Sequence, residues 1–294
     1  MSNKRHFALI TLIWSGISLP VGVASAATFQ VESHERAIEL ARAGALDESL
    51  ELIDELRTAD PANLQLRYDQ SVVLGWAELD EEAVAVATEI DAENAPAYVL
   101  RTVAKSLRNL GDFEAAASWY SLLLAQSDRD IEARIGLVMA HADAGRISAA
   151  RQALDAHPDP ENHRIRLRLA EGYILERQGR FTEALASYQA VLDRDPGNPS
   201  ALRAMVLLLR SILLPQEALT LARQHPGVVS DEEIVNLEAD AAALRIRFGA
   251  QSAYPASQKF LGTDKALSNL DELVARNDLT AAVRQRRLYD RVVA

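Results

Sequence analysis

The sequence predicts an all-α protein, a right-handed α–α superhelix of stacked helix pairs with extra C-terminal helices. Two observations predict this fold. Glycine recurs every 34 residues at Gly111, Gly145 and Gly179, and three further columns keep the same spacing. The segment 165–198 also shows the apolar periodicity of two short amphipathic helices. The other three columns are Ala116, Ala150, Ala184 and Ala218; Phe113, Ile147 and Phe181; and Tyr120, Leu154 and Tyr188.

Composition limits the function. The chain has 294 residues, 49% of them hydrophobic, a formal net charge of −11 and a sequence pI near 5.1. This length provides a sizeable core without disulfide or metal staples. The absence of cysteine excludes disulfides, thiol nucleophiles and Cys-ligated zinc. The acidic balance argues against non-specific nucleic-acid binding, so no nucleic-acid partner is expected.

The first element is an export signal rather than part of the fold. Lys4 and Arg5 precede an apolar run over 7–23, and the small residues 24–26 follow it. This order is typical of a secretory signal peptide, so we expect residues 1–26 to be removed after Ala26 and the mature chain to lie in the periplasm. An uncleaved transmembrane anchor is the alternative, because the run approaches the ~20 residues that span a bilayer.

The unit 165–198 is the clearest repeat. We expect its first helix to end near Gln178, Gly179 to break it, and a second helix to begin near Thr182. Ala184 is small where the two helices approach, and Phe181 and Tyr188 fill the space around it. The same frame predicts six helix pairs over 30–232, in units 30–63, 64–96, 97–130, 131–164, 165–198 and 199–232.

Two units depart from the frame at the turn between their helices. The second has Ala77, Glu78, Leu79 and Asp80 there, without glycine. The sixth has Leu213 at the glycine position with Pro215 just after it, and we expect its turn to be distorted. The ends of units one and five are similar, with Asp-Pro-x-Asn over 60–63 and over 195–198.

The segment 233–294 is expected to be an irregular helical extension and the front of something longer. Ser230 and Glu233 form a predicted capping box at the start of its first helix. Ile234, Leu237, Ala241, Leu244 and Phe248 make its apolar stripe. Two more helices are predicted near 256–275 and 278–293.

The spacing Gly-x-Phe/Tyr-x-x-Ala, with an aromatic residue four positions later and a proline near the end, resembles the tetratricopeptide repeat (TPR). The resemblance covers about 200 residues. It implies a TPR solenoid that binds a ligand in a concave groove, at positions 2, 5, 9, 12 and 13 of the first helix in each unit. The groove residues implied here are Gln65, Tyr68, Val72, Gly75, Trp76, Tyr98, Arg101, Lys105, Arg108, Asn109, Arg166, Tyr173, Glu176, Arg177, Arg203 and Arg210. Arg101 and Lys105 also match part of the family's two-repeat carboxylate clamp, but Ile135 and Met139 leave that clamp incomplete.

No catalytic site is predicted. The chain has no phosphate-binding glycine loop, no nucleophile elbow and no paired-carboxylate constellation, so we expect neither an enzyme nor a cofactor. The densest polar cluster joins Asp155, His157, Asp159, Glu161 and His163. Its spacing matches no known metal site, and Pro158 and Pro160 favour an inter-repeat loop.

A second resemblance rests mainly on residues outside the repeats. The chain is similar to the N-terminal periplasmic region of the poly-N-acetylglucosamine export porins. The residues that carry this similarity lie in 237–247, in 260–267, in 270–273 and in the arginine-rich 284–291. The resemblance implies a scaffold that docks a periplasmic de-N-acetylase and guides a glucosamine polymer toward an outer-membrane pore. No strand pattern of a β-barrel occurs before Ala294, so we expect the barrel to lie outside this chain.

Two functions stay open at the level of sequence. Removing 1–26 makes the charge (31 − 2) − 42 = −13, which would attract a cationic polymer, whereas the arginines of the predicted groove would repel it. The alternative is a general periplasmic protein-interaction scaffold for envelope assembly. An enzyme is a distant third possibility.

Overall fold

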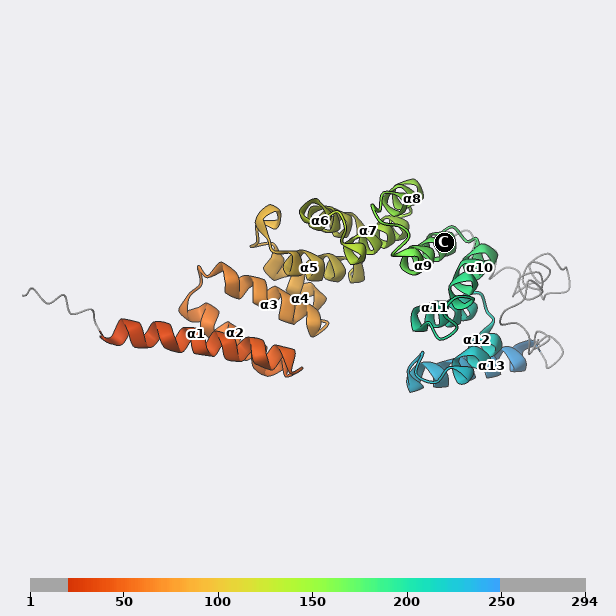
Figure 1. Cartoon of the computed structure of the whole chain (residues 1–294). Helices are drawn as coiled ribbons and strands as arrows, with labels where there is room; N and C mark the ends of the chain where they lie inside the picture. The colour runs from red at the N-terminus through yellow and green to blue at the C-terminus, as the bar shows by residue number, and fades with distance from the viewer. Residues whose placement is uncertain (1–20, 249–294) are drawn as a thin grey trace, which may run out of the picture.

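The structure is a computed structural model that describes residues 21–248, with side chains from 31 to 242. The described part is all helical, with 13 α-helices, one short 3₁₀ helix and no strand. Figure 1 shows the helices stacked into an arch, with α5, α7 and α9 on its inner side and α6, α8 and α10 on its outer side. The predicted fold class is confirmed.

Consecutive helices form six antiparallel pairs, one for each of the six predicted units, although α1 begins at Val21, before the predicted start of the first unit at residue 30. The first helices of the pairs are α1 (Val21–Arg42), α3 (Leu64–Trp76), α5 (Ala97–Asn109), α7 (Ile131–Asp143), α9 (Arg164–Arg177) and α11 (Pro199–Ser211). The second helices are α2 (Leu46–Ala59), α4 (Asp80–Ala87), α6 (Phe113–Gln126), α8 (Ile147–Asp155), α10 (Phe181–Leu192) and α12 (Pro215–Gln224). The 3₁₀ helix η1 (Ala92–Asn94) lies after α4, and α13 (Asp231–Phe248) follows the last pair.

Every turn within a pair contains one residue in the left-handed region. Four of the six are glycines, at 44, 111, 145 and 179, and the other two are Glu78 with φ 59° and Leu213 with φ 65°. Leu214 N–H donates to the Leu209 carbonyl at 2.8 Å, as Asp112 N–H does to the Leu107 carbonyl at 2.9 Å. The expected distortion of the sixth turn is therefore wrong. Leu213 adopts the glycine conformation because the stacked helices on either side fix the turn.

Two of the connections between units end in an asparagine that caps the following helix. Asn63 accepts hydrogen bonds from the first turn of α3, and Asn198 does so for α11. Each asparagine also donates to the aspartate three residues earlier, Asp60 at 3.3 Å and Asp195 at 2.9 Å. The repeated Asp-Pro-x-Asn sequence is thus a repeated helix cap.

The alanine column marks the closest contact within each pair. Ala83, Ala116, Ala150, Ala184 and Ala218 are all 0% exposed. In the first pair the position holds Ser49, also 0% exposed, whose hydroxyl donates to the Ala37 carbonyl at 2.8 Å. A small side chain is required there because the two helices cross closely.

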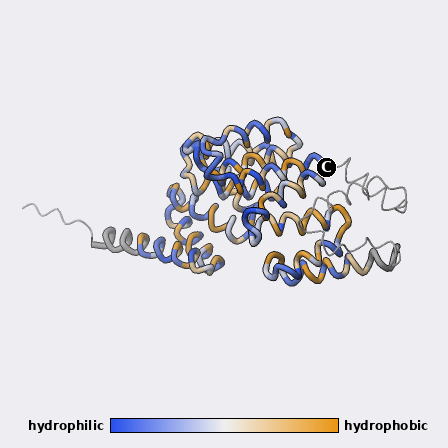
Figure 2. The backbone as a smooth tube through the Cα atoms, turned by 45° about the vertical axis from the view of Figure 1, so that its right-hand side comes forward, coloured by the Kyte–Doolittle hydropathy of each residue, from blue (hydrophilic) through white to orange (hydrophobic). Residues whose placement is uncertain are grey.

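Tyr188 packs across the same contact in the fifth pair. Its ring is 2% exposed and lies over Gly172 of α9, where a Cβ would be only 2.4 Å from a ring carbon. The expected filling of this space by Tyr188 is confirmed. Figure 2 shows polar and apolar positions alternating along the helices, as expected when each helix buries one stripe.

The buried apolar side chains form three clusters. The N-terminal cluster contains Ala37, Ala41, Ile53 and Val73. The central cluster runs from Tyr68 to Ile174, and the C-terminal cluster runs from Leu175 to Leu237. The boundary between the last two lies within α9.

The predicted capping box at the start of α13 is confirmed. Glu233 N–H donates to the Ser230 hydroxyl at 3.2 Å, and Ser230 N–H donates to the Glu233 carboxylate at 2.8 Å. Leu237 and Ala241 of the predicted stripe are buried. The side chains of Leu244 and Phe248, the helices expected near 256–275 and 278–293, and residues 1–20 of the predicted signal peptide lie outside what the structure describes. Within 21–248, no helix has the length and apolarity needed to cross a membrane.

Candidate functional site

The candidate site is the side of the first helices that faces the inside of the arch. Arg164, Arg168 and Glu171 of α9 line a cavity together with residues of the outer helices α8 and α10. The opposite side of α9 therefore faces inward. We call the inner face the residues at repeat positions 2, 5, 9, 12 and 13 of these helices. It includes Gln65, Trp76, Tyr98, Arg101, Lys105, Arg108, Asn109, Glu132, Ile135, Met139, Asp143, Arg166, Leu169, Tyr173, Glu176, Arg177, Arg203, Leu207 and Arg210.

The arginines of the inner face are paired with carboxylates of neighbouring elements. Arg101 donates to Asp130 at 2.6 Å, and Arg108 donates to Asp143 at 2.8 Å. The other pairs are Arg166 with Glu132, Arg203 with Glu233 at 2.8 Å, and Arg210 with Asp240 at 2.8 Å. The partners lie 29 to 35 residues apart, about one repeat. These arginines tie successive units together, so the inner face is not a surface of free positive charge.

Asp143 is the centre of the most extensive polar network. Its side chain is 8% exposed and accepts hydrogen bonds from Arg108 and from the Tyr173 hydroxyl, with Arg177 at 3.2 Å. The Tyr173 ring lies between the two guanidinium groups, at 5.7 Å from Arg108 and 4.9 Å from Arg177. Burial raises the pKa of Tyr173, and its hydrogen bond to Asp143 raises that pKa further.

Glu176 borders this network. Burial raises the pKa of its carboxyl, although Arg177 and the Tyr188 hydroxyl, which donates to it, act in the opposite direction. Four helices thus contribute to one set of charges: α5, α7, α9 and α10.

A second network joins the first three units. Asp69 of α3 accepts hydrogen bonds from Gln65 at 3.0 Å and from the Tyr98 hydroxyl at 3.3 Å, and it lies 2.7 Å from His34 of α1. Burial and the nearby Asp69 carboxylate raise the pKa of Tyr98 to about 12, against the effect of the Gln65 hydrogen bond. Tyr98 is nevertheless 41% exposed, so its ring faces solvent while its hydroxyl is held.

The other predicted residues differ in exposure, and Asn109 donates to Asp80 at 3.0 Å. Trp76 is 51% exposed, and Lys105 is exposed with no hydrogen bond or ion pair among the described residues.

The placement of Tyr68, Val72 and Gly75 in the groove is wrong, because all three are buried, with Tyr68 6% and Val72 5% exposed. Tyr68 belongs to the same core cluster as Ile90 and Ala95, from the loop that follows the short helix α4.

An apolar stripe that was not predicted from the sequence lies in the middle of the inner face. Ile135 and Met139 of α7 are partly exposed, as is Leu169 of α9, and Leu207 of α11 is 41% exposed. Together with Tyr173 they occupy repeat positions 5 and 9 on three successive inner helices. The signal was present in the sequence, since Ile135 and Met139 are the residues that interrupt the carboxylate clamp. Apolar groups at this spacing suit an apolar ligand surface.

The histidine-containing loop folds on itself. The His157 ring is 5% exposed, accepts a hydrogen bond from Asp159 N–H at 3.0 Å and packs edge-on against His163 at 4.8 Å. Burial and the nearby His163 and Arg134 lower the pKa of His157. Among the described residues, no three His, Asp or Glu side chains are grouped to hold a metal ion.

Comparison with known proteins gives three results. A model of the tetratricopeptide repeat family matches residues 102–163, 135–199 and 169–225. No curated protein matches the sequence significantly. Among solved structures, a tetratricopeptide repeat protein from Parabacteroides merdae superposes with a TM-score of 0.59 at 15% identity, over 89% of this chain and 98% of that one.

A second solved structure is YrrB, described as a TPR protein with an unusual peptide-binding site. It superposes with a TM-score of 0.50 at 16% identity, over 64% of this chain and 98% of that one. At these identities the superpositions show a shared fold. The family model, the 34-residue period and the six helix pairs agree. Residues 102–225 match the tetratricopeptide repeat family, and the described part of the chain has the fold of tetratricopeptide repeat proteins.

Proposed function

We propose that the chain is a non-catalytic scaffold that holds a segment of a protein partner on its inner face. The apolar stripe of Ile135, Met139, Leu169, Tyr173 and Leu207 carries this proposal. Apolar side chains left open between paired charges provide affinity, whereas the paired charges at the rim exclude mismatched partners.

The fold supports the same proposal. Stacked helix pairs present a long, continuous surface whose shape depends on packing rather than on flexible loops. Such a surface binds an extended or helical segment without a large ordering cost on the side of the scaffold. YrrB, which shares this fold, is described as having a peptide-binding site, and a peptide is the kind of ligand proposed here.

The location of the function rests on the N-terminal sequence. The basic residues, the apolar run and the small residues at 24–26 support export to the periplasm. We therefore expect the partner to be an envelope protein. The de-N-acetylase of an exopolysaccharide export system is the specific candidate that the resemblance in 237–291 supports.

The test is a comparison of retained partners. The purified chain is immobilised and incubated with an envelope extract of its source, beside a Met139→Glu/Leu207→Glu double variant. A charge on the stripe must be desolvated when a partner binds, so we expect a protein retained by the wild type to be lost in the double variant. Leu110→Glu is the matched control, because Leu110 is 43% exposed and lies in the turn between α5 and α6, away from repeat positions 5 and 9.

Equal retention by the wild type and the stripe variant, with both folded, would refute binding on the inner face. Loss of retention in the Leu110 variant as well would indicate a non-specific effect of added charge. Circular dichroism of each variant checks that the helices are intact.

A second function is supported by the exposed Trp76 and Tyr98. Aromatic rings of this exposure stack on sugars, and the internal pairing of the arginines removes much of the expected repulsion of a cationic glucosamine polymer. Titration with partly deacetylated glucosamine oligomers, followed by tryptophan fluorescence, tests polymer guidance. We expect a saturable change in fluorescence that is absent in Trp76→Phe. The lack of any change at millimolar oligomer would refute polymer guidance and leave protein binding as the proposed function.

A further inference from the structure

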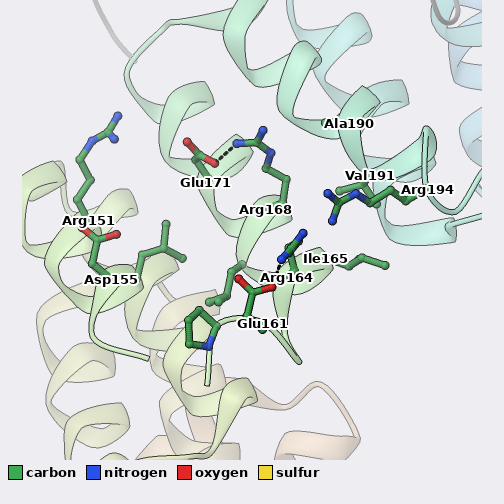
Figure 3. Close-up of a pocket in the computed structure, with 13 residues that line it drawn as sticks. Arg151, Asp155, Glu161, Arg164, Ile165, Arg168, Glu171, Ala190, Val191 and Arg194 are labelled. Carbon is green, nitrogen blue, oxygen red and sulfur yellow. Dashed lines mark hydrogen bonds and ion pairs between the residues drawn. The ribbon is translucent and has the colours of Figure 1, made fainter. Parts of the chain in front are cut away.

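A cavity of about 470 Å³ lies on the outer side of the arch, away from the inner face. It is formed by the end of α8, the loop that follows, the first two turns of α9, and the last turn of α10 with the residues just after it. Figure 3 shows the side chains of these elements surrounding an open space, with Arg194 and Val191 on one side and Arg151 and Asp155 on the other. Its volume is within the range of pockets that bind small ligands.

The cavity exists because α8 is short. The outer helix α6 has 14 residues, whereas α8 has nine and ends at Asp155. The effect is visible at two arginines that are 34 residues apart and hence equivalent in the repeat. Arg134 is 8% exposed and donates to the Asp128 carbonyl, whereas the side chain of Arg168 is 47% exposed and borders the cavity. The same repeat position is thus covered in one unit and open in the next.

The cavity gathers positive charge in an acidic protein. Four arginines line it, at 151, 164, 168 and 194, against the three carboxylates of Asp155, Glu161 and Glu171. Two arginines have no carboxylate partner among the described residues. The Arg151 side chain donates only to the side-chain oxygen of Gln178, at 3.1 Å, and the Arg194 side chain has no hydrogen bond or ion pair among the described residues.

The two other arginines are held only by nearby residues on the surface. Arg168 pairs with Glu171 at 2.6 Å, and Arg164 pairs with Glu161, both three residues apart in sequence. Exposed pairs of this kind contribute little stability, so an incoming carboxylate can replace the internal one. The first turn of α9 also has no side-chain cap, which leaves its N–H groups available at the edge of the cavity.

The remaining lining is apolar. Leu154, Pro160, Ile165, Leu167, Ala190 and Val191 contribute to the cavity, and Val191 is only 1% exposed. Guanidinium groups around apolar side chains fit a ligand that alternates carboxylates with aliphatic groups. A free inorganic anion would use the arginines and leave the apolar wall unused.

We propose that this cavity is a second docking site, which takes a short acidic segment of a protein partner with an aliphatic side chain beside each carboxylate. The proposal rests on the proposed scaffold function and adds a binding site on the outer side of the arch. The partner would then be held at two places, the inner face and this cavity, and the combined affinity would exceed that of either site.

The experiment is calorimetric titration of the purified chain with a blocked peptide, acetyl-Asp-Leu-Asp-Leu-Asp-amide. The control peptide has asparagine in place of each aspartate. We expect saturable binding of the acidic peptide below about 1 mM and at least tenfold weaker binding of the neutral peptide. Arg151→Gln/Arg194→Gln should weaken binding of the acidic peptide at least tenfold, because both arginines lack a structural carboxylate partner.

Arg223→Gln is the matched control. It removes an exposed arginine of α12, outside both the cavity and the inner face, and we expect the affinity for the acidic peptide to stay within twofold of the wild type. Equal affinity in the wild type and the double variant would overturn the proposal, as would equal binding of the neutral peptide. Displacement of the peptide by an equal concentration of inorganic phosphate would overturn it too, by showing a site for any small anion.

These outcomes are separable from those of the proposed function. Loss of partner retention in the Met139/Leu207 variant, together with no peptide binding in the cavity, would leave the scaffold function standing and refute the second site. Peptide binding in the cavity, with unchanged partner retention in the Met139/Leu207 variant, would support the second site and refute partner binding on the inner face.

Discussion

Glu176 shows how burial acts on a single residue of the inner face. Burial raises the pKa of its carboxyl above the ordinary value of 4.5, so the folded chain favours the protonated form. The stability that this group contributes is fully present below pH 4.5 and is lost as the pH rises through the pKa of the folded state. At neutral pH the carboxylate therefore weakens the fold.

We predict that Glu176→Gln stabilises the chain at pH 7 and that the gain disappears near pH 4, where the wild-type side chain is neutral too. Glutamine keeps an oxygen that can accept from the Tyr188 hydroxyl. Urea unfolding of both proteins at pH 4 and pH 7 measures the difference in the free energy of unfolding. A variant that is less stable at pH 7, or a difference independent of pH, would contradict this account.

The partners of the inner-face arginines could not be predicted from repeat position. Repeat position alone indicated that Arg101, Arg108 and Arg166 lie on the inner face, but it did not reveal their partners. Asp130 and Asp143 are 29 and 35 residues away in sequence from the arginines that they bind. Such pairs depend on how successive helices cross, which the period of the sequence does not specify.

At the scale of elements, the turns within the helix pairs share one backbone conformation although their residues differ. Glu78 takes φ 59° at a position where four of the other five turns have glycine, and its side chain is exposed. A non-glycine residue in the left-handed region destabilises the folded state by about 1–2 kcal/mol. Glycine removes this strain, but its greater freedom in the unfolded state cancels part of the gain in stability.

We therefore predict that Glu78→Gly raises the free energy of unfolding by about 0.5–1 kcal/mol. Gly111→Ala is the matched control. Gly111 has φ 83° and open space around its Cα, so alanine there should lower stability by about 1 kcal/mol through backbone strain alone. Chemical denaturation measures both changes, and a destabilised Glu78→Gly variant would show that the glutamate has a compensating role.

At the scale of the whole molecule, the division of the core into clusters predicts that a destabilising substitution affects the nearby helices and not the whole arch. The central and C-terminal clusters meet only within α9, and each helix pair stacks on its neighbours alone. Leu208 of α11 is 0% exposed in the C-terminal cluster. Replacing it by alanine removes apolar contacts and leaves a cavity, which costs about 2–5 kcal/mol.

We predict that Leu208→Ala accelerates amide hydrogen exchange in α10 to α13 while α5 and α6 keep their wild-type protection. Exchange followed by mass spectrometry resolves these segments. A uniform loss of protection across 97–224 would show that the arch unfolds as one cooperative unit instead.

Residue spacing along the chain was enough to predict the all-α fold, the helix pairs and the capping box of Ser230 and Glu233. Each of these depends on residues within one period of each other, where spacing and local hydrogen bonding act directly. The other features depend on tertiary packing. It buried Tyr68, forced Leu213 into the left-handed region, paired the arginines of the inner face and left the cavity behind α9 open. These features depend on how far one helix extends over the next, and the short α8 is the clearest example.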